Sequence, residues 1–325
     1  MSSGCRIVRE VGEAAELLAA GGVVAFPTET VYGLGADASN YEAVGRIFRI
    51  KGRPADHPLI VHLASMDQLR DWALEIPDQA YILAERFWPG PLTLILRRDS
   101  RVSGVVTGGQ DTVGLRVPGH PVALELLRRF GGGIAAPSAN RFGRISPTTA
   151  RHVLEELGDR LELIVDGGPC RIGLESTIVS LAGPEPLLLR PGAIPAGMIE
   201  KVLGGHRLRY PPDSGRPRTP GMHASHYAPR NPFRVVERTM LPESVRRLQQ
   251  AGRKVVVITF QSRVDELPDK VAFHVMPGDP DDYARELYAV MRALDNGDFD
   301  IIVADAPPDS MQWQAVRDRL YRAAG

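Results

Sequence analysis

The sequence has few cysteines, no net charge and no long apolar runs, and each shortage excludes a class of protein. Two cysteines in 325 residues, Cys5 and Cys170, cannot form a disulfide framework or a four-cysteine zinc site, which fits a reducing cytoplasm. Thirty-nine basic residues balance 39 acidic ones, which argues against nucleic-acid binding driven by a basic excess. No apolar run reaches the roughly 18 residues of a membrane span, and charges interrupt the N-terminal segment too early for a secretory signal.

Familiar nucleotide and zinc motifs are also missing. The sequence contains no G-x-x-x-x-G-K-[ST], so it has no P-loop. Residues 33–38 match G-x-G-x-x-A, but they do not directly follow the strand expected to end at Phe26, so we expect no dinucleotide site there. Zinc needs three or four ligands, and two isolated histidine pairs do not supply them: His57 and His62, and His223 and His226.

The first two-thirds of the chain alternates short apolar runs with amphipathic segments, which is typical of mixed α and β structure. We predict helices over 11–20, from a Ser39–Glu42 capping box to about residue 50, from Ser65 and Gln68 onward, and from Ser146–Pro147 with the serine as N-cap. The predicted strands span residues 23–26, 59–63, 92–96, 112–117, 161–165, 177–181 and 187–190.

The composition changes after about Leu203. Six prolines between residues 210 and 232 exclude a regular helix or a central strand, so we expect an extended linker over 206–232. Beyond the linker, strands expected at 233–236, 254–260, 271–275 and 300–304 alternate with helices near 244–250, 281–294 and 312–323. This alternation predicts a small parallel α/β domain.

Two short motifs could bind an anion, and each also has an ordinary structural explanation. Lys51 and Arg53 lie on a tight loop after a predicted helix, where they could clamp phosphate. Taken alone, compensation of the helix dipole by surface cations is the better interpretation of this loop. Ser138 and Asn140 share one face of an extended segment beside small residues, but they equally fit a strand-to-turn cap.

Taken together, seven motifs in this order are far more specific than any one of them: F-P-T-E-T-V-Y-G-L-G, K-G-R-P, W-P-G-P-L-T, D-T-V-G-L-R-V-P, A-A-P-S-A-N, E-S-T-I-V and L-R-P-G-A-I. Over residues 6–205 the sequence closely resembles the YrdC-like threonylcarbamoyl-AMP synthases. The P-G-M-H-A-S-H-Y-A-P linker and the trailing domain resemble the long, two-domain form of that family, which commonly has an aromatic residue where this chain has Ala224.

The resemblance implies an α/β architecture in three parts. A YrdC-like catalytic domain over 1–205 would have a curved mixed sheet and a large concave, positively lined cavity. A proline-rich linker over 206–232 would act as a lid, and residues 233–325 would form a smaller Rossmann-like parallel domain. The implied enzyme is a nucleotidyltransferase that joins L-threonine, bicarbonate or CO2, and ATP into L-threonylcarbamoyl-adenylate and pyrophosphate.

The resemblance also implies partners and site residues. A downstream transferase complex would pass the group to ANN-decoding tRNAs, Mg2+ would arrive on the triphosphate, and no membrane would be involved. Lys51 and Arg53 would be the catalytic cations. The expected ATP contacts are Lys51, Arg53, His57, Thr112, Ser138, Asn140, Ser146, Arg190 and Tyr227. The expected threonine contacts are Thr30, His62, Arg116, Ala136 and Ser176.

The sequence alone is also compatible with two other functions. YrdC-like modules also form carbamoyl-adenylate from carbamoyl phosphate in carbamoyltransferases, but those proteins usually carry further cysteine-rich or histidine-rich modules. A concave basic cavity could instead bind RNA directly, although zero net charge argues against strong, salt-dependent binding.

Overall fold

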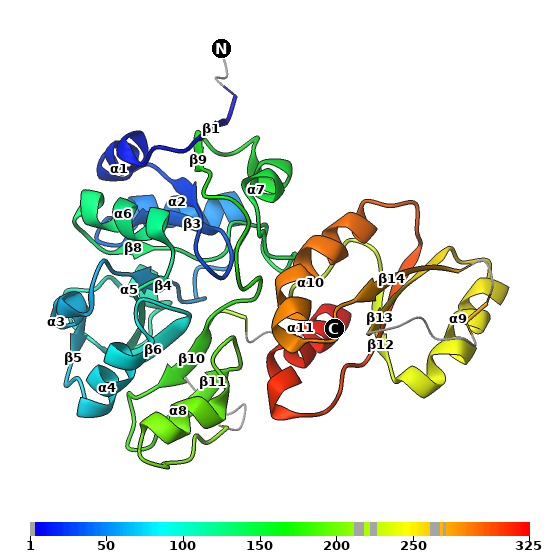
Figure 1. The fold of residues 1–325 in the computed structure, drawn as a ribbon. Helices are drawn as coiled ribbons and strands as arrows, with labels where there is room; N and C mark the ends of the chain where they lie inside the picture. Colours follow the sequence, from blue (N-terminus) through cyan, green and yellow to red (C-terminus); the bar gives the residue numbers. More distant parts are fainter. Residues whose placement is uncertain (1–3, 211–217, 222–225, 261–266, 269–270) are drawn as a thin grey trace. The chain divides into compact units, whose positions relative to one another are not determined.

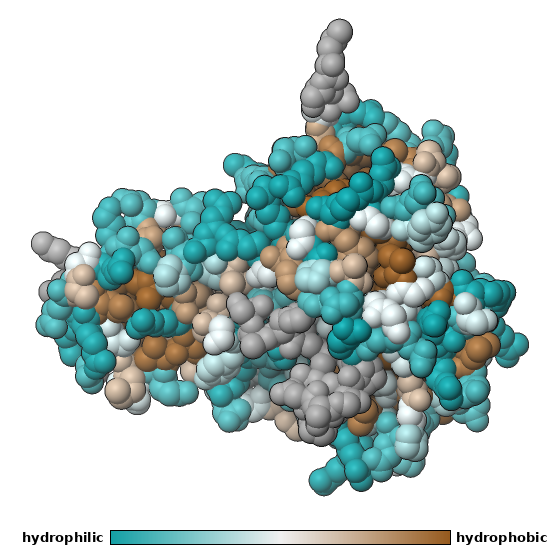
Figure 2. Space-filling model, turned by 180° about the vertical axis from the view of Figure 1, so that it is seen from behind, coloured by the Kyte–Doolittle hydropathy of each residue, from teal (hydrophilic) through white to brown (hydrophobic). Residues whose placement is uncertain are grey.

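The computed structural model describes residues 4–210, 218–221, 226–260, 267–268 and 271–325. The chain forms two compact units, one of residues 1–142 with 146–222 and one of residues 143–145 with 223–325 (Figure 1). Hydrophilic residues cover most of the face shown in Figure 2, with apolar patches between them. Within the described ranges, no helix is both long and apolar enough to cross a membrane.

Within the described residues, the first unit is built on a mixed sheet of eleven strands. Ten of them follow the order β1-β9-β2-β3-β8-β4-β7-β6-β10-β11, and β5 pairs with β6. The strands are β1 (Arg6–Val8), β2 (Val24–Phe26), β3 (Gly33–Asp37), β4 (Ile60–His62), β5 (Ala73–Leu74), β6 (Leu92–Arg98), β7 (Thr112–Arg116), β8 (Ile134–Ala135), β9 (Leu163–Val165), β10 (Thr177–Ser180) and β11 (Leu187–Arg190). The sheet contains both parallel and antiparallel pairs, which confirms the predicted mixed sheet.

Helices cover both faces of this sheet. They are α1 (Gly12–Ala19), α2 (Tyr41–Lys51), η1 (Met66–Gln68), α3 (Leu69–Trp72), α4 (Asp78–Phe87), α5 (Gly104–Thr107), α6 (Pro121–Phe130), α7 (Ala150–Leu157) and α8 (Ala196–Val202). Successive side chains of a strand point to opposite faces. Phe26 accordingly packs in one apolar cluster with Leu18 of α1 and Leu126 of α6, whereas Ala25 packs in another with Ile47 of α2.

Two predicted helix starts were wrong. Asn40, not Ser39, caps α2. Its Oδ1 accepts hydrogen bonds from the backbone N–H groups of Glu42 and Ala43, at 3.1 Å each. Helix α7 begins at Ala150, capped by Thr149, and not at Ser146. The Ser146 hydroxyl instead donates to the Glu175 carboxylate at 2.6 Å, so this side chain makes a tertiary contact away from the start of the helix.

The glycines that match G-x-G-x-x-A lie in a strand. Residues 33–37 form β3, which runs antiparallel to β2 and to β8. A dinucleotide site needs these glycines at a turn that opens a helix. This segment is therefore part of the sheet and not a phosphate-binding turn.

The second unit contains, among its described residues, a four-stranded sheet in the order β12-β15-β13-β14. All three neighbouring pairs are parallel, which confirms the predicted parallel α/β domain. Its elements are β12 (Phe233–Val236), η2 (Arg238–Met240), α9 (Leu241–Gln250), β13 (Val255–Phe260), β14 (Ala272–Met276), α10 (Pro280–Asp295), β15 (Ile301–Asp305), η3 (Met311–Trp313) and α11 (Gln314–Ala324).

The described part of the predicted linker, residues 206–210, 218–221 and 226–232, contains no helix or strand. It forms isolated bridges instead, one between Arg209 and Leu187 and one between Ala228 and Arg144. His223 and Ala224, which the sequence singled out, lie outside the described residues.

Candidate active site

Lys51 joins two of the predicted motifs. It ends α2, its side chain is buried at 3% exposure, and its Nζ donates to the carbonyl oxygens of both Ser138 and Asn140 at 2.5 Å. Gly52 follows in the left-handed region at φ 63°, where glycine is favoured, and turns the chain toward Arg53. Because both cations are buried, they are not the surface cations of a simple dipole-compensating loop.

Arg53 lies beside an aromatic ring that it shares with His57. The guanidinium carbon lies 5.6 Å from the ring centroid of Phe142, and the His57 ring lies 5.1 Å from the same ring. Arg53 also donates to the carbonyl oxygen of Pro58 at 3.0 Å. The flat ring and the carbonyl fix the guanidinium plane, as recognition of an anion by two parallel N–H groups requires.

The charge of Lys51 has no carboxylate partner among the described residues. Burial, followed by the nearby charge of Arg53, lowers the pKa of Lys51 well below its ordinary value, and Glu156 opposes this only in part. A buried ammonium held by two neutral carbonyl oxygens is strongly stabilised by an anion. This arrangement suits a phosphate group.

Arg116 lies at the end of β7, where a buried carboxylate and a hydroxyl hold it. Its Nη2 donates to Glu29 at 2.6 Å and to Thr30 Oγ1 at 3.0 Å, and its Nε donates to the carbonyl oxygen of Gly90 at 3.2 Å. His62 of β4 is the direct neighbour of Arg116 in the parallel pair β4–β7. The structure thus brings together three of the predicted threonine contacts.

His62 is uncharged in the native protein at neutral pH. Burial, and then the positive charge of Arg116, lowers the pKa of His62 to about 3. Ala136, also predicted as a threonine contact, follows β8 and donates its N–H to the carbonyl oxygen of Ile60, two residues before His62. The pair β4–β8 thus places Ala136 beside the strand that carries His62.

Ser176 and Arg190 connect the predicted threonine and ATP contacts. Arg190 donates to the Ser176 carbonyl oxygen at 3.0 Å and to its hydroxyl at 3.1 Å, and this hydroxyl also shares a hydrogen bond with Thr93. A further N–H of Arg190 donates to the carbonyl oxygen of Pro220 at 2.9 Å. A described residue of the predicted linker therefore contacts a predicted ATP ligand.

The remaining predicted ATP contacts lie on separate elements. Thr112 begins β7, four residues before Arg116 and therefore on the same face of the strand. Tyr227 belongs to the second unit, where its ring stacks on Tyr288 with centroids 5.7 Å apart and lies 5.2 Å from the guanidinium of Arg319. Its contact with ATP stays a prediction.

Two buried carboxylates next to the site were not among the predicted residues. Glu29 precedes Thr30 and pairs with Arg116, and Glu175 precedes Ser176 and accepts from Ser146. A signal for both was present in the sequence, because each lies in an otherwise uncharged motif beside a strand. Glutamate is rarely buried without a partner. Each of these two positions therefore predicts a nearby cation or hydroxyl that pairs with the carboxylate.

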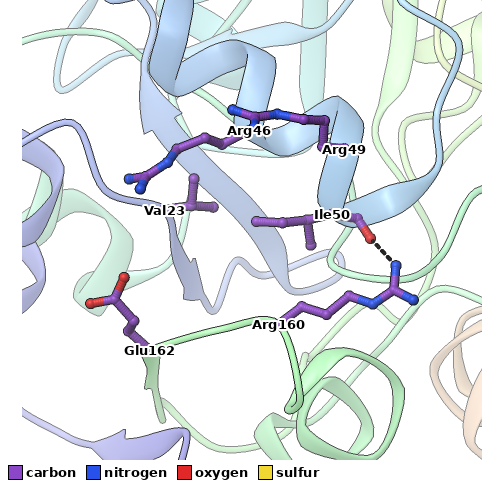
Figure 3. Close-up of a pocket in the computed structure, with 6 residues that line it drawn as sticks. All are labelled: Val23, Arg46, Arg49, Ile50, Arg160 and Glu162. Carbon is purple, nitrogen blue, oxygen red and sulfur yellow. Dashed lines mark hydrogen bonds between the residues drawn. The ribbon is translucent and has the colours of Figure 1, made fainter. Parts of the chain in front are cut away.

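A surface pocket of about 230 Å³ lies elsewhere in the first unit (Figure 3). It is lined by Val23, Arg46, Arg49, Ile50, Arg160 and Glu162, none of which is a predicted site residue. Arg160 donates to the carbonyl oxygen of Ile50 at 3.0 Å (Figure 3). Across the part of the chain that the structure describes, no group of three or more acidic, histidine or cysteine side chains could hold a metal ion.

Two family models cover nearly the whole chain. The model described as "Telomere recombination" matches residues 16–192, and the model described as "Threonylcarbamoyl-AMP synthase, C-terminal domain" matches residues 194–325. The first alone covers more than half of the chain.

Curated relatives match over almost their full length. The threonylcarbamoyl-AMP synthase of Pyrococcus abyssi is 45% identical over 96% of this chain and 93% of its own, and that of Bacillus subtilis is 44% identical over 97% and 93%. The crystal structure of P. abyssi Sua5 complexed with L-threonine has a TM-score of 0.90 at 43% identity, covering 98% of this chain and 96% of that one.

Proposed function

Because this chain belongs to the threonylcarbamoyl-AMP synthase family, we propose that it condenses L-threonine, bicarbonate or CO2, and ATP into L-threonylcarbamoyl-adenylate and pyrophosphate. The chain is thus an enzyme of the nucleotidyltransferase type. The observation that carries the proposed reaction is the buried Lys51, held by Ser138 and Asn140 with no carboxylate partner among the described residues. The threonine complex of P. abyssi Sua5 supports threonine as a substrate.

In the proposed reaction the neutral threonine amine attacks CO2, a C–N bond forms, and the nitrogen gives up a proton to solvent. A carbamate oxygen then attacks the α-phosphorus of ATP, an O–P bond forms, and the bond to pyrophosphate breaks. Two anions meet in this step, so fixed cations and hydrogen-bond donors supply most of the catalysis. Lys51 and Arg53 are buried and preorganised for this task.

The two halves of the site would divide the substrates. We assign the α-amino acid to the half that contains Thr30, His62 and Arg116, with the guanidinium receiving its carboxylate. The nucleotide would occupy the other half, with its phosphates near Lys51 and Arg53. Ser176 and Arg190, which are hydrogen-bonded to each other, lie where the two halves meet.

The proposed function also involves Mg2+, a downstream partner and a cellular location. Mg2+ would be held by the triphosphate oxygens, since this ion usually keeps few protein ligands beside a nucleotide. The adenylate would be consumed by a tRNA threonylcarbamoyl transferase complex in the cytoplasm, in the modification of ANN-decoding tRNAs. The contacts of described linker residues with the rest of the first unit, such as Arg218 with Asp56 at 2.9 Å, support a linker that helps to enclose the nucleotide.

One incubation tests the proposal directly. The protein is mixed with ATP, threonine, bicarbonate and Mg2+, and threonylcarbamoyl-adenylate is sought by mass spectrometry, with each substrate omitted in turn. We expect the product only in the complete mixture. Product formed from carbamoyl phosphate instead would favour the carbamoyltransferase alternative, and salt-dependent RNA retention without adenylate would favour the RNA-binding one.

A further inference from the structure

The ion pair between Glu29 and Arg116 lies inside the proposed threonine site, yet neither the reaction nor substrate binding assigns a role to the glutamate. The two side chains are 3% and 5% exposed, and the nitrogen and oxygen atoms lie 2.6 Å apart. Burying two charges carries a desolvation cost that their mutual attraction and further hydrogen bonds must offset. A buried ion pair in a binding site therefore suggests a role in binding as well as in stabilising the fold.

The cations of the site differ in how they are compensated. Arg116 has an internal counter-ion in Glu29. Lys51, by contrast, is held by two neutral carbonyl oxygens and forms no ion pair with any residue that the structure describes. The described residues therefore supply no ion-paired counter-charge at Lys51, whereas the Arg116 position is close to neutral before substrate arrives.

The geometry of Arg116 is also fixed by this pair. Its Nε and Nη2 are engaged by Gly90, Glu29 and Thr30. Its Nη1 makes no hydrogen bond within the described part of the chain. The guanidinium therefore cannot rotate freely, and it presents the two N–H bonds of Nη1 to a ligand.

From these observations we propose that Glu29 is a positioning residue that sets the charge selectivity of the amino-acid site. This inference rests on the proposed function, in which Arg116 receives the threonine carboxylate. Threonine is a zwitterion, whereas bicarbonate, ATP and pyrophosphate are net anions present in the same reaction. A neutral Arg116–Glu29 pair accepts a net-neutral ligand, but a multiply charged phosphate there would leave uncompensated negative charge at low dielectric.

Removing the carboxylate charge should reverse this preference. In Glu29→Gln the shape is nearly kept, but Arg116 becomes an uncompensated buried cation that attracts carboxylates and phosphates and repels the threonine ammonium. We expect the inhibition constant of pyrophosphate measured against threonine to fall roughly tenfold, which corresponds to about 1.4 kcal/mol. Pyrophosphate, expected to compete mainly with ATP in the wild type, should become a competitive inhibitor against threonine.

Two variants separate charge from structure. Glu29→Asp keeps the negative charge and should keep the exclusion of pyrophosphate even where threonine binds less well. Glu75→Gln is the matched control, because Glu75 pairs with Arg97 at 3.1 Å on the exposed surface of the same unit, and it should leave both KM values unchanged. An unchanged pyrophosphate inhibition pattern in a folded Glu29→Gln protein would overturn the inference.

The inference stays testable if the Glu29 variants do not fold. For the wild-type protein we expect 2,3-dihydroxybutanoate, the net-anionic analogue of threonine without an amine, to bind at least roughly tenfold more weakly than threonine in calorimetry. Equal affinities for the two ligands would refute charge selection by this site. A wild-type protein that binds threonine selectively but forms no adenylate would contradict the proposed reaction and leave the inference intact.

Discussion

The ammonium of Lys51 donates to the backbone carbonyl oxygen of Ser138, 87 residues later in the chain. This single contact joins the end of α2 to the segment that follows β8, and the same Nζ also reaches Asn140. Among the described residues, backbone oxygens alone accept hydrogen bonds from this buried side chain. Its charge is available to a substrate, and the predictions below follow from that relationship and from its counterpart at Arg116.

The two cations at the end of α2, Lys51 and Arg53, should dominate the chemical step. We expect Lys51→Ala and Arg53→Ala each to lower the rate of adenylate formation by about 100-fold or more, since each removes a preorganised donor from the developing charge. The rate is measured by pyrophosphate release, and circular dichroism reports the fold. Arg49→Ala, an exposed cation on the same helix, is the control and should have normal turnover. Normal turnover in either active-site variant would remove the electrostatic argument.

Binding of ATP should be accompanied by proton uptake. Burial and Arg53 lower the pKa of Lys51 in the free protein, and the triphosphate would favour the charged form and raise that pKa again. Over the pH range between the free and bound pKa values, the protein should therefore take up a proton from the buffer. Calorimetry in buffers of different ionisation enthalpy measures the number of protons taken up on ATP binding. We expect this uptake to be absent in Lys51→Met. Uptake that persists in the variant would point to another group.

Sequence patterns were sufficient for much of the fold, because buried strands carry β-branched runs that can be recognised locally. The strand β3 was missed because residues 33–37 contain two glycines and little β-propensity, and pairing with β2 and β8 stabilises it instead. Helix α6 was overlooked although His120 caps its start and Gly131 ends it at φ 80°. At Ser146 the local capping signal was overridden by the contact with Glu175.

The site was less accessible to sequence reasoning than the fold. Motif order identified the residues, but not which of them touch, because Lys51 and Ser138, or Glu29 and Arg116, lie more than 80 residues apart. Such contacts arise from the sheet order, which places β8 and β7 beside β4. The sequence therefore could not predict which residues pair with the buried charges, and the structure was needed to identify them.

The amino-acid half of the site should fail selectively when Arg116 is replaced. We expect Arg116→Ala to raise the threonine KM roughly tenfold or more with a much smaller effect on the ATP KM, because a charged hydrogen bond to the carboxylate is lost. The variant also leaves Glu29 as an unpaired buried charge, which should lower the unfolding free energy by about 3–5 kcal/mol. Steady-state kinetics and urea unfolding measure the two effects. An equal loss for both substrates would argue against recognition of the carboxylate by Arg116.

His62 should make the protein sensitive to acid. Its native pKa is about 3, whereas an unfolded histidine titrates near 6.5. Between these two pKa values the unfolded chain binds a proton at His62 and the native protein does not. The contribution of His62 to the unfolding free energy is therefore fully present above about pH 6.5 and is lost progressively as the pH falls toward 3. His62→Gln removes the titration while keeping a polar side chain. We expect its unfolding free energy, measured in urea at pH 7, 6, 5 and 4, to fall less steeply than that of the wild type. Parallel curves would show that His62 is not the group responsible.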